Sequence, residues 1–151
     1  MEYKSDKGGP ATRNYFEGIL QLRNPTKEAV RAVRSMVERN KRAFIAKEER
    51  VVNGIDFYIS SQKFLQILGK MLQNKFGGEL KISRKLFTVH RITSKRVYRV
   101  TVLFRLPKFK VGDIVKTRGR LIKVKSLGKK VFGIDIETGK KITVDYKHVQ
   151  A

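Results

Sequence analysis

The sequence VVNGIDFYISSQKFLQILGKMLQNKFGGEL, residues 51–80, decides the predicted fold because its hydrophobic period changes partway along. Over residues 55–59 apolar and polar residues alternate, which is typical of a strand with one buried face. Over residues 64–76 apolar residues recur at helical spacing, and Gly77-Gly78 is a typical helix stop. The stretch therefore predicts a strand followed by a helix, too small a unit to bury its own apolar face.

The flanking residues predict the rest of an α+β domain. Ser60 and Ser61 are both candidate N-caps of the helix, since a side-chain oxygen can accept from first-turn amides. Asn53-Gly54 predicts a type I′ hairpin, and Asn24-Pro25 predicts the cap and first turn of an earlier helix. The expected elements are strands over residues 15–23, 44–52, 55–60, 79–89 and 96–106, with helices over 25–40 and 61–76. This order predicts two helices on one face of a mainly antiparallel sheet.

Pro107 marks a predicted boundary between two domains, because proline ends strand pairing. Residues 14–106 form the predicted α+β domain. Residues 107–151 carry short β-rich runs separated by glycine turns, which predict a small β-barrel of the SH3-like or OB-like kind. Residues 1–13 are polar and contain Gly8-Gly9-Pro10, so we expect a disordered lead-in.

The charge of the chain points to a polyanionic partner. There are 35 Lys and Arg against 13 Asp and Glu, a net charge of +22. Self-repulsion at this level favours binding of nucleic acid, although a lysine-rich soluble surface is the alternative. The chain has no cysteine and no P-loop, and neither histidine stands in a catalytic motif. We therefore expect no enzymatic activity, no cofactor, no metal, no small-molecule substrate and no membrane partner, with a cytoplasmic location.

Candidate RNA contacts lie on the predicted long hairpin and at the barrel turns. The hairpin strands alternate, so their basic and hydroxyl residues are expected on the sheet face opposite the core. Such a face suits phosphate and 2′-hydroxyl contacts, but an ordinary solvated sheet face has a similar composition. The candidate contact residues are Arg91, Lys95 and Arg96 at the hairpin tip, Lys81, Lys85, Arg99 and Arg105 on its strands, and Arg118, Arg120, Lys129 and Lys130 at the barrel turns.

Several separated runs resemble archaeal members of the large-ribosomal-subunit export adaptor family, historically named nonsense-mediated mRNA decay protein three. The likeness covers about residues 15–149. The runs that carry it are NGIDFYI at 53–59 with SQKF at 61–64, KFGGELKISRKLF at 75–87 and YRVTVLFRLP at 98–107.

The resemblance implies an L22e-like α+β domain followed by a barrel similar to translation factor five-A. It also implies an adaptor that docks on the intersubunit face of a nearly mature large ribosomal subunit, with rRNA and ribosomal proteins as partners. Members of the family begin with Cys-X-X-Cys zinc sites, whereas this chain has no cysteine. We therefore expect either the middle and end of a longer protein or a shortened homologue.

The expected function is non-enzymatic binding of the large subunit during late maturation, with basic loops holding rRNA phosphates. Two alternatives remain open. One is a protein-interaction adaptor whose basic surface meets an acidic partner, and the other is a general RNA-binding protein.

Overall fold

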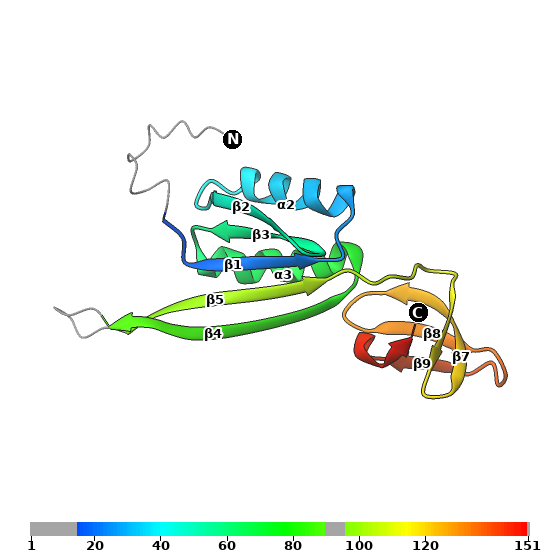
Figure 1. Cartoon of the computed structure of the whole chain (residues 1–151). Helices are drawn as coiled ribbons and strands as arrows, with labels where there is room; N and C mark the ends of the chain where they lie inside the picture. Colours follow the sequence, from blue (N-terminus) through cyan, green and yellow to red (C-terminus); the bar gives the residue numbers. More distant parts are fainter. Residues whose placement is uncertain (1–14, 90–95, 151) are drawn as a thin grey trace.

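The computed structural model describes residues 15–89 and 96–150, excluding the side chains of residues 87–89, 96 and 97. These residues form two five-stranded sheets and two α-helices (Figure 1). The expected α+β class is confirmed. The predicted disordered lead-in, residues 1–13, lies outside the described residues.

The first sheet contains the five strands predicted before, between and after the two helices in the sequence. Its strand order is β2-β3-β1-β5-β4, and all neighbouring pairs are antiparallel except β1 and β5. Its elements are β1 (Gly18–Arg23), α2 (Lys27–Arg39), β2 (Ile45–Val51), β3 (Gly54–Ile59), α3 (Gln62–Phe76), β4 (Glu79–Val89) and β5 (Arg96–Arg105).

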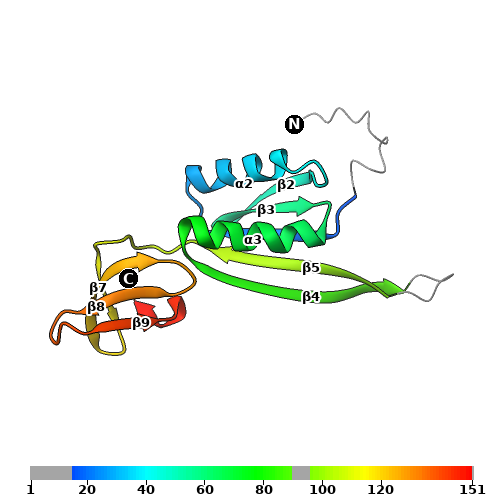
Figure 2. The same cartoon turned by 180° about the vertical axis from the view of Figure 1, so that it is seen from behind.

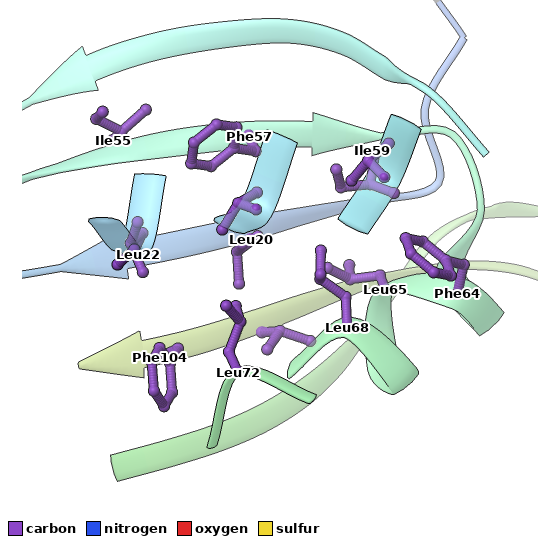
Figure 3. Packing of buried hydrophobic residues seen from close by; sticks show 14 of the residues in the cluster. Leu20, Leu22, Ile55, Phe57, Ile59, Phe64, Leu65, Leu68, Leu72 and Phe104 are labelled. Carbon is purple, nitrogen blue, oxygen red and sulfur yellow. The ribbon is translucent and has the colours of Figure 1, made fainter. Parts of the chain in front are cut away.

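Both helices cover the same face of this sheet, as expected. Leu20 on β1 is the register partner of Phe57 on one side and Val102 on the other, so these side chains share a face. All three are completely buried, and Leu68 and Leu72 of α3 belong to the same apolar cluster (Figure 3). The opposite face of the first sheet is thereby left to solvent or to a partner.

Helix α3 begins with two acceptors at its N-terminus. Ser61 Oγ accepts from Phe64 N at 3.1 Å, and Glu17 Oε1 accepts from Gln62 N at 2.8 Å. Ser61 is therefore the N-cap. Ser60, the other candidate, is buried and accepts from Phe44 N at 2.8 Å, which ties the loop before β2 to the end of β3.

Helix α2 begins later than Asn24-Pro25 predicted. Thr26 is the N-cap, with its side chain accepting from Ala29 N at 3.1 Å. Asn24 instead takes a positive φ of 54° and donates through Nδ2 to Leu106 O at 3.0 Å. Its side chain therefore ties the end of β1 to the end of β5 rather than capping a helix.

The turn between β2 and β3 also differs from the prediction by one residue. Val51 pairs with Gly54, so the central turn residues are Val52 and Asn53. Type I′ requires a positive φ at both central positions. Among the non-glycine residues described, Asn53 has a positive φ, 61°, and Val52 does not, so the turn is not type I′. Gly54 serves a different need, because a Cβ there would lie 2.2 Å from Leu22 O on β1.

Strands β4 and β5 extend beyond the other elements of the first sheet in both views (Figures 1 and 2). The register of β4 against β5 shifts between Leu86 and Thr88. Leu80 packs against the core, but Ile82 on the same face of β4 is 37% exposed. The core face of the hairpin therefore continues past the region that the helices cover.

The second sheet contains the short strands expected after Pro107, but it is not a closed barrel. Its order is β10-β6-β7-β8-β9, so β10 and β9 are edge strands, and it is barrel-like rather than closed. Val115, Ile122 and Val131 are among its buried residues. Its elements are β6 (Ile114–Thr117), β7 (Arg120–Leu127), β8 (Val131–Asp135), β9 (Lys141–Val144), the 3₁₀ helix η1 (Tyr146–His148) and β10 (Val149–Gln150).

The turn after α3 contacts the second sheet. Gly78 N donates to Gly128 O at 3.4 Å, and a Cβ added at Gly77 would lie 2.6 Å from the Cβ of Leu127. Gln73, which is buried, donates through Nε2 to Gly78 O at 2.9 Å and so holds the turn from the helix side. The predicted division into two domains at residue 107 stays a prediction.

Candidate nucleic-acid interface

A row of basic and hydroxyl side chains lies on the outer face of the β4–β5 hairpin, away from the helices. Ser83 pairs with Thr101 and Lys85 pairs with Arg99, so each pair lies side by side across the two strands. We call these six residues the basic sheet face: Lys81, Ser83, Lys85, Arg99, Thr101 and Arg105. The same register places Glu79 opposite Arg105 and Leu103 opposite Lys81. The register confirms that the six residues share one face, as their alternation predicted. Their role as RNA contacts stays a prediction.

Two aromatic rings position Arg99 on the basic sheet face. Its guanidinium carbon lies 4.0 Å from the centroid of the Phe16 ring, a cation–π distance. Phe16 in turn meets Tyr58 edge to face, with ring centroids 4.9 Å apart. Tyr58 packs against the flank of the sheet. It donates to Glu49 Oε1 at 3.0 Å, and this hydrogen bond raises the pKa of Tyr58.

Acidic residues lie on the other half of the same outer surface. Arg23 on β1 pairs with Asp56 on β3 at 2.8 Å. Glu49 on β2 also faces outward, since it is the register partner of Asp56. Carboxylates therefore offset cations over β1, β2 and β3. The strongest positive field on this surface is expected over β4 and β5.

The helix-side face of the β4–β5 hairpin also carries a cation, Arg84, level with the start of β1. The guanidinium carbon of Arg84 lies 4.9 Å from the centroid of the Tyr98 ring, and Leu86 beside it is 48% exposed. Neither helix covers the end of the hairpin that extends beyond β1 (Figure 1).

A cleft of about 500 Å³ lies where the first sheet meets the second. Its lining includes three exposed cations, Arg105 from β5, Lys108 from the connection and Lys147 from η1. Tyr146 and the carboxylate of Glu79 also line it. The volume is within the usual range of small-ligand sites. The cleft continues the basic sheet face, since Arg105 belongs to both.

Tyr146 links the cleft to the junction between the sheets. Its hydroxyl donates to Gly128 O at 2.6 Å, and its ring stacks on Phe109 with centroids 6.4 Å apart. Burial raises the pKa of Tyr146 above its ordinary value, so the phenol stays protonated and neutral near neutral pH. The aromatic wall of the cleft is thus held in one orientation.

Two of the four cations predicted at the turns of the second sheet have acidic partners. Arg120 lies 3.6 Å from Asp135, and Lys130 lies 3.6 Å from Asp145. Arg118 and Lys129 are exposed in the same two turns. Both cations are largely exposed, so the pairing reduces the positive field there without removing it.

The hairpin tip cannot be placed in this arrangement. Arg91 and Lys95 lie outside the described residues, and so does the side chain of Arg96. Within residues 15–89 and 96–150, no group of three or more His, Cys, Asp or Glu could hold a metal ion. Within the same residues, no helix is long and apolar enough to cross a membrane.

The comparisons with known proteins bear on the first sheet. A family model described as NMD3, second domain, matches residues 15–106, which span all seven elements from β1 to β5. No curated protein matches the chain.

Proposed function

The chain belongs to the NMD3 family, whose members are non-enzymatic adaptors in ribosome biogenesis and export, and from this premise we propose that it binds rRNA on the intersubunit face of the large ribosomal subunit. Family membership supports a general association with that subunit. The single observation that carries the RNA-binding proposal is the row of cations and hydroxyls on the basic sheet face. In this proposal the chain acts in the cytoplasm, late in the maturation of the large subunit.

The chemistry of the basic sheet face fits an RNA backbone. Lys81, Lys85 and Arg105 supply charge for phosphates, while Ser83 and Thr101 supply hydroxyls that can bond to phosphate oxygens and to 2′-hydroxyl groups. Since Ser83 and Thr101 are cross-strand partners, both hydroxyls lie between the cations of the row. This pattern recognises the shape and charge of RNA rather than its base sequence.

The shape of the hairpin supports insertion between RNA segments. It extends past the rest of the first sheet (Figure 2). Close to the level where β1 begins, it carries Arg84 on one face and Lys85 on the other. A ribbon with cations on both faces can contact two phosphate backbones at once. By occupying this position, the chain covers surface of the subunit that tRNA or other factors need later.

The proposal is tested by co-sedimentation with purified large subunits over a series of salt concentrations, with total RNA as competitor. We expect saturable binding that weakens with salt and that survives an excess of total RNA, because a specific site adds contacts to the general phosphate attraction. Complete loss of binding to the competitor would instead indicate a general RNA-binding protein. Absence of RNA binding at low salt would contradict both functions.

The cleft gives a second prediction. Replacing both Lys108 and Lys147 by Ala is expected to weaken RNA binding about tenfold and to reduce the salt slope by about one to two, since each lysine contributes one phosphate contact. Fluorescence anisotropy with a labelled single-stranded RNA measures both quantities.

The matched control replaces Lys70 and Lys63 by Ala, because both are exposed on α3 and lie on the helix side of the molecule. It removes the same charge away from the cleft, so its affinity is expected to change less than threefold. Equal effects of the two double variants would show that only net charge matters and that the cleft is not part of the RNA path.

A further inference from the structure

The outer face of the second sheet differs in chemistry from the basic sheet face. Four large apolar side chains are exposed there, at 58% for Ile114, 52% for Leu121, 44% for Phe132 and 48% for Ile136. Lys123 and Lys116 are the cross-strand partners of Ile114 and Leu121, while Ser126 and Thr143 are those of Phe132. We call this surface the apolar–lysine face, and it consists of Ile114, Leu121, Phe132 and Ile136 with Lys116, Lys123 and Lys141.

The strand register arranges the two residue types alternately. Lys116 on β6 is the partner of Leu121 on β7. Across the sheet, Lys123 lies between Ile114 on β6 and Ile134 on β8, and Ile134 is in turn the partner of Lys141 on β9. Every apolar side chain in this rung therefore has a lysine beside it.

The inward-facing residues of the same strands form the hydrophobic core of the second sheet. Val115, Ile122 and Val124 alternate with the outer residues and are buried. The outer apolar residues are thus not needed to fill the second cluster. Exposed apolar side chains that gather on one face mark a site of interaction more often than isolated ones do.

The charges on this face are of one sign. No carboxylate occupies an outward strand position among the described residues of β6 to β9. Asp135, which does lie in β8, is buried on the inner side. A partner must therefore supply negative charge for the lysines and apolar surface for Ile114, Leu121 and Ile136.

From this complementarity we propose that the apolar–lysine face binds an acidic protein segment whose carboxylates alternate with apolar side chains. Aliphatic side chains gain little from RNA, whose exposed backbone is charged and polar. This face lacks the arginines of the basic sheet face, and its two hydroxyl residues, Ser126 and Thr143, are the cross-strand partners of Phe132 rather than of each other. A second copy of the chain does not fit, because it would place lysines against lysines in a protein of net charge +22. This inference does not depend on the proposed function.

The test uses the full chain and two synthetic peptides. One is an acidic amphipathic peptide of Glu and Leu, and the other has every Leu replaced by Ser, so that the charge is equal. Isothermal titration is expected to show at least tenfold tighter binding of the Leu-containing peptide, which is about 1.4 kcal/mol, since only that peptide buries apolar surface.

The triple variant Ile114→Thr, Leu121→Thr, Ile136→Thr is expected to lose this preference, while its RNA affinity stays unchanged. Threonine favours strands and the three side chains are half-exposed, so the fold is retained, which a thermal melt checks. The matched control Val52→Thr, Ile67→Thr removes exposed apolar groups elsewhere, at 94% and 49% exposure, and is expected to keep the preference.

Three outcomes would overturn the inference. The first is equal affinity of the wild-type chain for both peptides, which would show attraction by charge alone. The second is a triple variant that keeps the preference for the Leu-containing peptide. The third is a triple variant that loses binding to RNA or to phosphatidylserine vesicles instead, which would assign the face to that ligand.

Discussion

Replacing Gly77 by Ala is expected to lower the free energy of unfolding by about 3 kcal/mol, one of the largest effects of any single methyl group in the chain. Gly77 has φ 73° and ψ 154°, a backbone conformation that is nearly restricted to glycine. The added Cβ would also lie 2.6 Å from the Cβ and 2.9 Å from the backbone carbon of Leu127. Urea unfolding followed by circular dichroism measures the loss.

Gly119 provides the matched control for this prediction. It has a similar φ of 79°, but a Cβ there would meet nothing within 4 Å. Gly119→Ala is therefore expected to cost only the backbone strain, about 1 kcal/mol. If the two variants lost equal stability, the close contact between the α3 turn and the second sheet would be contradicted.

The second large effect is expected on RNA affinity. Replacing Lys81, Lys85 and Arg105 together by Ala is expected to raise the dissociation constant about a hundredfold at low salt and to reduce the salt slope by about two. The physical reason is that each cation on the basic sheet face releases counterions when it meets a phosphate. Binding to large subunits, measured by co-sedimentation over a salt series, gives both values.

A variant that loses the same charge on the helix side distinguishes the effect of the basic sheet face from the effect of the chain's overall charge. Lys27 and Arg31 of α2, with Lys41 just after it, are exposed on the side of the molecule that the helices form. Replacing these three by Ala is expected to change the affinity less than about fivefold, since bulk charge acts only at long range. A comparable loss in both triple variants would remove the basic sheet face from the proposed function.

The order and type of the elements of the first sheet could be predicted because their signals are local. Val100, Val102 and Phe104 occupy every second position along β5, and all three are buried. The same alternation correctly predicted that Lys85 and Arg99 share the outer face. Period two is a property of the strand itself, so it needs no knowledge of the neighbours.

Caps and turns were predicted less well, because their residues can serve more than one purpose. Asn24 is a good helix cap, but its side chain bonds instead to Leu106 O, far along the chain. Ser60 is as good a cap as Ser61, but it is used to bond Phe44 N. Both residues have the capping preference that was predicted. A hydrogen bond to a residue distant in the sequence decided that neither of them caps a helix.

The cleft could not be predicted, because its residues are distant in the sequence. Arg105 and Lys108 are near one another, but Lys147 reaches the same site only through the packing of the second sheet. Pro107 was the one available signal, since it marked the junction beside which the cleft lies. The pairing of Arg120 with Asp135 likewise depends on which strands become neighbours.

The sequence by itself determined the strand and helix of residues 51–80, the single buried face of the first sheet and the excess of positive charge. These follow from periodicity and composition, which are local or additive. Only the tertiary structure decided that β1 and β5 are parallel neighbours, that Gly77-Gly78 meets Leu127, and that apolar residues and lysines alternate across the second sheet. Those arrangements depend on strand register and chain packing, which join residues that no local pattern connects.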